Sequence, residues 1–345
     1  MKWKSVAMLG FAALAAGCAT DTTAPAIQPA ATRPSLAFSA SPCTFTIDGT
    51  TMRLDADCST STTITIPNGF TLDGAGYTIT AVNPVSGAFL GGVVKNADAT
   101  AHVTKVNIRT DGLIGCKGGD ERLRGILLEG ASGSITHSSV VGINRGASGC
   151  QEGNAIEVRN APFDGTHPNT VSVEIAHNTV ADYQKTGIVC NGDANCSIHH
   201  NDVGASATQA NLAANSVQLG FGATGDLTLN KIAGNSWCIN TSAAATAVLL
   251  YLPSSGVVVE SNRIDGNSDV GIYAYGDGMV IAKNRVADVG ADCSVYDVGI
   301  GDYGSNYPLS SNSLVKNSVS GFDEPYDPAS PGGKNKVKSA QPLPF

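Results

Sequence analysis

This sequence has few charged residues, few aromatic residues and no long apolar run after Ala16. Charged residues make up 14% of the 345 positions, aromatic residues make up 6%, and the formal net charge is −8. Lys and Arg do not gather into a basic patch, so no nucleic-acid partner is expected. No later apolar run is long enough to cross a bilayer. Segments with helical periodicity are also absent after the N-terminus, which leaves an all-β chain.

What the sequence has instead is a repeat. Seven times an aliphatic residue is followed three places on by Asn or Ser and five places on by another aliphatic residue. The polar position holds Ser138, Asn178, Asn201, Asn230, Asn262, Asn284 and Asn317, and a variant with Val106 in this position precedes them. Asn at the same place in consecutive coils is expected to stack its amides inside a bend and to accept a left-handed backbone there.

A second series alternates with the first. It is a small residue followed by an aliphatic one, at Gly125-Ile126, Ala155-Ile156, Gly187-Ile188, Ser216-Val217, Ala247-Val248, Gly271-Ile272 and Gly299-Ile300. Two strand motifs per unit, joined without helices, predict stacked parallel strands. The expected fold is therefore all-β, a single right-handed parallel β-helix with about eight or more coils, right-handed because parallel crossovers usually are.

The start of the chain predicts export. A short basic segment and an apolar stretch from Val6 to Ala16 precede Gly17-Cys18, which is typical of a signal peptide over residues 1–17. Cys18 directly after Gly17 resembles a bacterial lipobox, which implies a lipid-modified Cys18; ordinary cleavage elsewhere is the alternative. Residues 18–42 are expected to form a flexible tether, 43–322 the β-helix and 323–345 an irregular tail. The predicted location is the bacterial cell envelope, as a lipoprotein of the outer membrane or cell surface.

Cysteine usage agrees with export. Eight cysteines remain besides Cys18, and an even count in an exported chain favours disulfides. Neighbour order predicts the pairs Cys43–Cys58, Cys116–Cys150, Cys190–Cys196 and Cys238–Cys293. A metal site is the alternative use of these thiols, but no CxxC motif or nearby His pair supports it.

A resemblance follows from these motifs. The segment Leu72-Asp73-Gly74-Ala75-Gly76-Tyr77-Thr78-Ile79, followed by the Asn repeats, resembles the right-handed parallel β-helix superfamily typified by pectate lyases. The repeats are also similar to those of NosD-like periplasmic proteins. The resemblance implies the fold. Members include polysaccharide lyases, glycoside hydrolases, uronate epimerases and proteins with no known catalysis, and no catalytic signature transfers, so function must be argued from the surface.

Alternation along each strand predicts the outer surface. If the aliphatic residue of each small-aliphatic pair points inward, the small residue points outward and forms a smooth strip along the axis. Three positions after the aliphatic, Tyr251, Tyr275 and Tyr303 recur, with Tyr273 beside them. The expected result is a shallow trough, floored by small residues and walled by Tyr, that suits an extended glycan. Cross-strand Tyr stacking that only stabilises the sheet is the alternative.

Two clusters in the expected trough could perform chemistry. In the first, Arg159 is expected to neutralise a substrate carboxylate, Lys185 to act as base and Tyr183 to act as acid, which together suit β-elimination. Glu157 and Gln218 lie in the same cluster. A surface salt bridge between coils is the competing interpretation.

The second cluster is Asp269 and Asp297, which occupy the same position on successive coils. They could be the acid and base of glycoside hydrolysis or ligands of Ca²⁺. They could also cap bends by accepting backbone N–H bonds. No other cofactor is expected.

Together these features predict an exported, lipid-anchored protein that binds an extended, uronic-acid-containing polysaccharide and cleaves it by β-elimination. The alternatives are a non-catalytic glycan-binding or scaffold protein, and a glycoside hydrolase that uses Asp269 and Asp297. The protein is expected to be a monomer that contacts the membrane only through its lipid anchor.

Overall fold

A computed structural model describes residues 41–160, 170–207, 209, 212–237, 243–290, 296–329 and 332–338, which belong to one compact unit. The predicted signal peptide, the lipidation site Cys18 and the Cys238–Cys293 pair lie outside the described residues. Within the described ranges, no helix is long and apolar enough to span a membrane.

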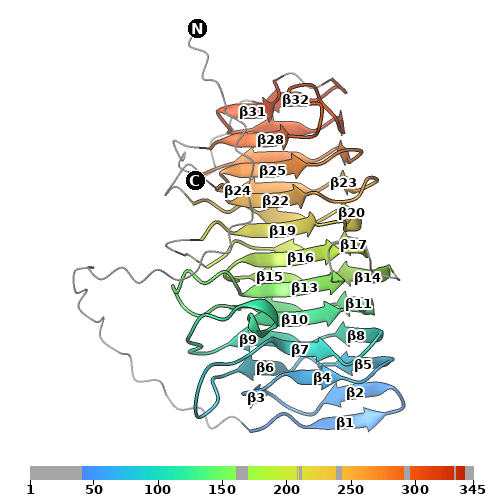
Figure 1. Cartoon of the computed structure of the whole chain (residues 1–345), viewed down its shortest axis with the longest axis vertical. Coiled ribbons are helices and arrows are strands. Elements are labelled where there is room, and N and C mark those ends of the chain that lie inside the picture. Colours follow the sequence, from blue (N-terminus) through green and yellow to red (C-terminus); the bar gives the residue numbers. More distant parts are fainter. Residues whose placement is uncertain are drawn as a thin grey trace, which may run out of the picture. The chain divides into compact units, whose positions relative to one another are not determined.

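Three sheets stack their strands along one axis (Figure 1). Sheet 1 has eleven strands, β1 (Phe45–Asp48), β2 (Thr51–Leu54), β5 (Phe70–Asp73), β8 (Thr100–Thr104), β11 (Ser132–Thr136), β14 (Val171–Ala176), β17 (Ala194–His199), β20 (Thr224–Thr228), β23 (Val258–Glu260), β26 (Val280–Ala282) and β29 (Ser313–Val315). Sheet 2 has ten strands, β4 (Ile64–Ile66), β7 (Gly92–Asn96), β10 (Arg124–Glu129), β13 (Asn154–Asn160), β16 (Thr186–Gly192), β19 (Asn215–Gly220), β22 (Thr246–Tyr251), β25 (Val270–Tyr275), β28 (Val298–Asp302) and β31 (Glu324–Asp327). Sheet 3 has eleven strands, β3 (Cys58–Thr60), β6 (Thr78–Ala81), β9 (Asn107–Thr110), β12 (Ser139–Val141), β15 (Thr179–Ala181), β18 (Asp202–Val203), β21 (Lys231–Ala233), β24 (Arg263–Gly266), β27 (Arg285–Asp288), β30 (Ser318–Ser320) and β32 (Lys336–Lys338).

Each coil contributes one strand to each sheet, so the chain forms a parallel β-helix, as predicted. The first two strands, β1 and β2, pair antiparallel and form a hairpin at the N-terminal end of the stack. At the other end, β31 pairs with β28 and β32 with β30. The solenoid therefore continues past residue 322 into the segment predicted to be an irregular tail. The described part also contains a 3-10 helix, Gly119–Glu121, in the loop before β10.

The Asn repeat forms a ladder at the turn between sheets 1 and 3. Oδ1 of Asn201 accepts from both the backbone N–H and the side-chain Nδ2 of Asn178, each at 3.0 Å, and Asn201 repeats the pattern with Asn230. The residue before each Asn has positive φ, for example 56° at His200. The amides thus satisfy buried backbone groups that a tight turn would leave without partners, and the structural interpretation of this series is confirmed.

The small residues of the second repeat face the core, not the solvent. Ala155, Ser216 and Ala247 are fully buried, and a Cβ added at Gly187 would lie 2.6 Å from the Ser216 carbonyl oxygen and 2.9 Å from Cε1 of Tyr183. The following aliphatic residues are buried too, so two successive residues point inward where the chain enters sheet 2. Strand alternation is broken at this corner, and the predicted outer strip of small residues is wrong.

Three of the predicted disulfides are present, Cys43–Cys58, Cys116–Cys150 and Cys190–Cys196. The interior is otherwise filled by stacked columns of Ile, Leu and Val. Asp302 interrupts this apolar interior. Its fully buried carboxylate accepts hydrogen bonds from Ser310, Ser311 and Asn312, so the charge is satisfied within one loop.

Candidate functional site

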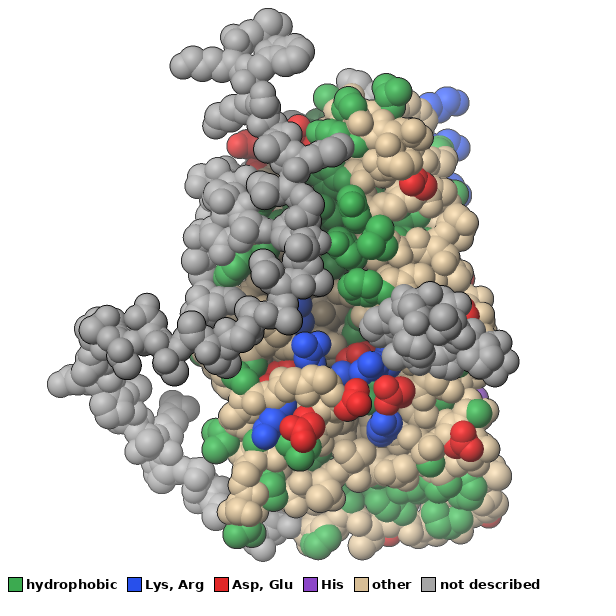
Figure 2. All heavy atoms as spheres, viewed as in Figure 1, with side chains coloured by type: hydrophobic (Ala, Val, Ile, Leu, Met, Phe, Trp, Pro, Cys, Tyr) green, Lys and Arg blue, Asp and Glu red, His purple; other side chains and the backbone are tan. Residues whose placement is uncertain are grey.

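The outer face of sheet 2 carries three columns of side chains. Because the small residue and the aliphatic residue both point inward, the outward positions lie two before, one after and three after that aliphatic residue. The position one residue after the aliphatic residue holds Leu127, Glu157, Val189, Gln218, Leu249, Tyr273 and Gly301 in successive coils. The position three residues after it holds Glu129, Arg159, Asn191, Gly220, Tyr251, Tyr275 and Tyr303. Strand pairing confirms that these residues, apart from Tyr303, are neighbours from coil to coil; Tyr303 directly follows the end of β28. Charged side chains gather over the lower strands of this face and apolar ones over the upper strands (Figure 2).

Arg159 is held by two carboxylates at the lower end of the face. Its Nη1 lies 3.3 Å from Oδ1 of Asp120, and its Nε lies 3.4 Å from Oε1 of Glu129. Glu129 also pairs with Lys95 at 2.6 Å. The charge of Arg159 is therefore already neutralised by carboxylates of the protein. For this residue the ion-pair interpretation fits better than the predicted role of neutralising a substrate carboxylate.

Glu157 is buried in an ion pair of its own. Its Oε2 accepts from Nε of Arg124 at 2.8 Å and from Nδ2 of Asn154 at 2.8 Å. Both charged side chains are at most 7% exposed, because the 117–123 loop covers them and supplies carbonyl acceptors to Arg124. A polysaccharide on the surface cannot reach Glu157, so its assignment to the catalytic cluster is corrected.

Tyr183 lies in the core beneath sheet 2. It is fully buried, and its hydroxyl donates to Oγ of Ser216 at 2.8 Å and accepts from Nδ2 of Asn235 at 3.1 Å. Burial raises the pKa of this phenol above its ordinary value. The predicted role of Tyr183 as an acid is wrong because no surface ligand can receive its proton.

Lys185 lies at the opposite edge of sheet 2 from Arg159. It directly precedes β16, whereas Arg159 is near the end of β13, and Asn154 pairs with Thr186. The two residues are thus about six residues apart along the strand direction, a separation of up to ~20 Å. One sugar ring cannot contact both, so the predicted Arg159–Lys185 centre is wrong.

The cation beside Lys185 is Arg122. Burial, together with the positive charge of Arg122, lowers the pKa of Lys185 to about 8. Nζ of Lys185 donates to the Ala213 carbonyl at 2.6 Å. Among the described residues, no carboxylate forms an ion pair with either Lys185 or Arg122.

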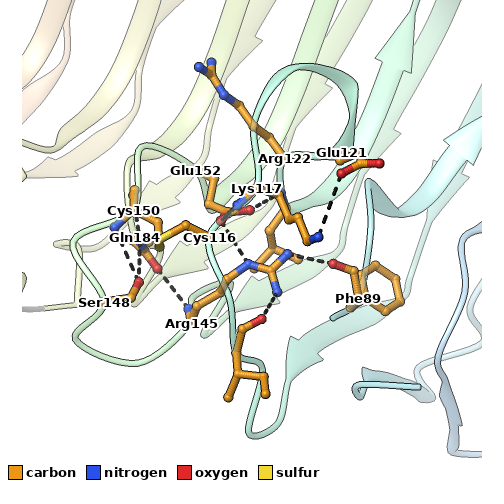
Figure 3. Close-up of polar contacts among 12 residues, drawn as sticks. Phe89, Cys116, Lys117, Glu121, Arg122, Arg145, Ser148, Cys150, Glu152 and Gln184 are labelled. Carbon is orange, nitrogen blue, oxygen red and sulfur yellow. Dashed lines mark hydrogen bonds and ion pairs between the residues drawn. A yellow bond between two sulfur atoms is a disulfide. The ribbon is translucent and has the colours of Figure 1, made fainter. Parts of the chain in front are cut away.

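A buried ion pair holds the loop that carries Arg122 (Figure 3). Nε of Arg145 lies 3.0 Å from Oε1 of Glu152, and both side chains are fully buried. Glu152 also accepts from the backbone N–H groups of Lys117 and Leu123, and Arg145 donates to the carbonyls of Phe89 and Ile114. Arg122 points away from this cluster in Figure 3. Sequence reasoning missed the pair because no local pattern marks it.

The Cys116–Cys150 disulfide and Gln184 secure the same region. The disulfide links the loop before β10 to the loop before β13. Gln184 accepts from the Arg145 backbone N–H at 2.8 Å and donates to the Cys150 carbonyl at 2.6 Å. Three successive coils are therefore cross-linked beside Lys185, which fixes its surroundings.

An aromatic patch covers the upper strands of the face. It comprises Phe221, Tyr251, Tyr273, Tyr275, Tyr303 and Tyr307. Tyr251 and Tyr275 stack with their ring centroids 5.3 Å apart, and Phe221 lies 5.5 Å from Tyr251. Tyr303 contacts Tyr273 at 4.8 Å and Tyr307 at 5.8 Å, not Tyr275 as predicted. Stacked rings with exposed edges form a platform on which an apolar sugar face can pack.

The hydroxyls of Tyr273 and Tyr303 are protonated at neutral pH. Burial raises the pKa of Tyr273 to about 12 and, with the nearby Asp327, raises that of Tyr303. Phe221 and Tyr307 were not predicted because both belong to turns outside the repeat. Between the patch and the charged end lies an amide pair, in which Nε2 of Gln218 donates to Oδ1 of Asn191 at 3.0 Å.

Asp269 and Asp297 cap loops. The carboxylate of Asp269 accepts from the backbone N–H of Trp237 at 3.0 Å and of Ala245 at 2.8 Å, and it is 2% exposed. Oδ2 of Asp297 accepts from the N–H of Asp323 at 2.6 Å. Asp269 thus accepts hydrogen bonds from backbone groups of the preceding coil, whereas Asp297 accepts one from the following coil. This arrangement favours the capping interpretation over a shared Ca²⁺ or an acid–base pair.

A pocket of about 300 Å³ lies at the corner between sheets 3 and 2. Ser206, Gln209, Asn235 and Asn267 contribute polar groups to its lining, and Ala214 forms part of its wall. Ala214 adjoins Ala213, whose carbonyl binds Lys185. The pocket therefore lies beside the residue that binds Lys185.

Comparison with known proteins agrees with this geometry. Residues 165–324 match the family described as "Right handed beta helix region". The chain is a right-handed parallel β-helix. No curated protein sequence is significantly similar to it.

The solved structures to which this chain is similar include two with low sequence identity. One is a DFA-IIIase from Arthrobacter chlorophenolicus A6 without its lid in complex with GF2, with 15% identity and a TM-score of 0.44 over 76% of this chain. This β-helix spans 65% of that protein's length. The other is a mutant of the periplasmic alginate epimerase AlgG, with 13% identity and a TM-score of 0.38 over 84% of this chain and 85% of the other.

Proposed function

We propose that this β-helix is an exported, lipid-anchored protein that binds an extended acidic polysaccharide along the outer face of sheet 2. The aromatic patch carries this proposal. Six aromatic side chains lie on consecutive coils of one otherwise aromatic-poor chain, and Tyr275 and Phe221 are each 39% exposed. Rings that only stabilised the sheet would gain nothing from this exposure, whereas a sugar that packs on them would bury their faces.

The length of the face supports an extended ligand. From β10, which follows the Arg122 loop, to β28, which carries Tyr303, the stack rises six coils, or about 29 Å. The Asn191–Gln218 amides lie between these ends and can exchange hydrogen bonds with hydroxyl groups. Arg122 and Lys185 then provide positive charge for carboxylates at the lower end.

The binding test uses purified protein in native gels that contain polygalacturonate, alginate or a neutral glucan. We expect retardation by the acidic polymers, and Tyr251→Ala and Tyr275→Ala should each weaken binding about tenfold, since a lost aromatic contact costs about 1–1.5 kcal/mol. Tyr77→Ala is the matched control because Tyr77 has the same 39% exposure outside the patch. Absence of retardation by every polymer, or equal effects of Tyr77→Ala and Tyr275→Ala, would refute the proposal.

A second candidate function is β-elimination at the lower end of the face, favoured by the lowered pKa of Lys185 beside Arg122. In this reaction Arg122 pairs with the uronate carboxylate, and neutral Nζ of Lys185 removes the proton α to it. The C–O bond at the β carbon breaks, a carbon–carbon double bond forms, and the leaving oxygen takes a proton from water.

The pH dependence separates the two candidates. If Lys185 only binds carboxylates as a cation, affinity falls as pH rises through about 8. If it is the base, ultraviolet absorbance of the conjugated product appears, and its rate of formation rises as pH rises through the same value. Lys185→Met should abolish that absorbance and leave binding through the aromatic patch. Product formed by this variant at the normal rate would exclude Lys185 as the base.

A further inference from the structure

A cluster of imidazoles lies at the turn between sheets 1 and 3, away from the proposed glycan face. His137, His177 and His200 occupy the same turn position in three successive coils, and His199 precedes His200 at the end of β17. The sequence scatters these residues over more than sixty positions. The Asn ladder brings them together because Ser138, Asn178 and Asn201 follow them directly and are hydrogen-bonded from coil to coil.

The turn position also explains why His is tolerated there. The backbone φ angles of His137, His177 and His200 are 51°, 58° and 56°. Among residues other than Gly, His is one of those enriched in this left-handed region. Other coils have Lys105, Leu229, Ser261, Lys283 or Lys316 at the same position, so the fold does not require histidine in three consecutive coils.

The rings are close enough to share a ligand. His177 stacks between His137 at 4.9 Å and His200 at 5.1 Å, measured between centroids, and His199 lies edge-on to both His177 and His200. Nδ1 of His199 and Nδ1 of His200 are 3.0 Å apart. One candidate ligand nitrogen from each of His177, His199 and His200 lies within 4.8 Å of the other two.

The carboxylate of Glu174 contacts the ring nitrogen of His199 that points away from His200. Nε2 of His199 lies 3.2 Å from Oε1 of Glu174 on the preceding coil. With a proton on Nε2 bonded to Glu174, Nδ1 of His199 has its lone pair directed toward His200. Metal-ligating histidines commonly have this arrangement, in which the second ring nitrogen donates to a carboxylate.

We propose that His177, His199 and His200 bind a late first-row divalent cation, Zn²⁺ or Cu²⁺, with Glu174 as the positioning residue of His199. Imidazole nitrogens suit these ions. Zn–N bonds of about 2.0–2.1 Å in a tetrahedral site place ligand nitrogens about 3.3 Å apart, close to the 3.0 Å between the two Nδ1 atoms. His177 and His200 are exposed, so their rings can rotate and water can complete the coordination.

Two physical consequences follow from this site. The ion replaces the proton shared between the two Nδ1 atoms, and it cross-links the coil of β14 to the coil of β17.

The test is isothermal titration of untagged, chelator-stripped protein with ZnCl₂ and, separately, CuCl₂. We expect one ion per chain, and Co²⁺ should give the intense visible bands of a four-coordinate site. His199→Ala and His177→Ala should each abolish stoichiometric binding, while Glu174→Gln should weaken it about 10–100-fold, as loss of such a carboxylate partner usually does. His102→Ala is the matched control, because His102 lies on the same sheet but pairs with Ser134.

A thermal readout separates binding from damage to the fold. Zn²⁺ should raise the Tm of the wild type and of His102→Ala but leave that of His177→Ala unchanged, with both variants folded in the far-ultraviolet spectrum. Wild-type protein that binds no ion at one equivalent would overturn the proposal. So would folded His199→Ala that binds Zn²⁺ as tightly as the wild type, since the ion would then lie elsewhere.

Discussion

Replacing Asn201 by Ala tests how much the ladder of amides contributes to stability. In the native turn, Oδ1 of Asn201 accepts from the backbone N–H of Asn178, and Nδ2 of Asn201 donates to the Ile175 carbonyl at 2.8 Å. Truncation leaves this buried N–H and this buried carbonyl without side-chain partners. Nδ2 of Asn178 keeps its bond to Ile135, and Asn230 keeps its bond from the Asn201 backbone.

The orphaned N–H costs about 1–3 kcal/mol and the lost bond to the Ile175 carbonyl about 0.5–1.5 kcal/mol, so the expected loss is about 1.5–4.5 kcal/mol, a large share of the 5–15 kcal/mol that typically holds a folded protein together. Urea unfolding followed by circular dichroism measures it, with a lower midpoint expected at an unchanged slope. Asn107→Ala is the control, because Asn107 donates only one bond, to Gly76 at an exposed turn, and should cost at most about 1 kcal/mol. A loss below about 1 kcal/mol for Asn201→Ala would refute the reasoning.

Asn201→Asp extends the same argument to pH. The new carboxylate keeps an acceptor for Asn178 but turns a second oxygen toward the Ile175 carbonyl and Oδ1 of Asn230. Only the protonated acid can donate there, so the folded-state pKa must rise above the unfolded value of about 3.9. The variant should therefore approach wild-type stability at low pH and lose stability as pH rises through its folded pKa. A variant equally stable at pH 4 and pH 7 would contradict the assigned bond directions.

Three further predictions concern sheet 2 and its loops. Gly187→Ala should destabilise the protein by about 1–3 kcal/mol in urea unfolding, because its Cβ would press on the Ser216 carbonyl; a neutral effect would mean that the small residues face solvent. Glu152→Gln should cost about 3–5 kcal/mol, since Arg145 would remain charged and buried without its partner, and a loss below 1 kcal/mol would contradict that. Lys185 has a folded pKa of about 8 against 10.5 ordinarily, so the unfolded chain binds more protons between these values and stability should rise with pH across that window. Lys185→Met should flatten this rise, and an unchanged slope would reject the shifted pKa.

Much of the solenoid could be predicted from local spacing. An aliphatic residue, an Asn three places on and a second aliphatic five places on together define a strand, a left-handed turn and a second strand, which is why the Asn201 turn was predictable. Cys190 and Cys196 could be paired because only five residues separate them. Strand register followed as well, since every coil repeats the same inward column.

The site was less predictable because it depends on side-chain direction and on loops. Alternation along a strand fails where the chain turns a corner, so the Gly187 column faces inward and the predicted trough does not exist. Tyr183 looks like an exposed phenol in the sequence, yet its loop folds under sheet 2 and buries it. Loops of irregular length also decide that Arg122, not Arg159, is the cation beside Lys185.

The sequence alone determined that the chain winds into stacked parallel coils. The reason is that the same pattern of aliphatic residues and Asn, with the same spacing, recurs in each coil and produces the same turn and the same buried side chains. Only the tertiary structure decided which distant residues meet. Arg145 and Glu152 pair through loops, and His177 reaches His199 and His200 across a coil boundary. Such contacts depend on the height and rotation of one coil relative to the next, and no local pattern of residues encodes those quantities.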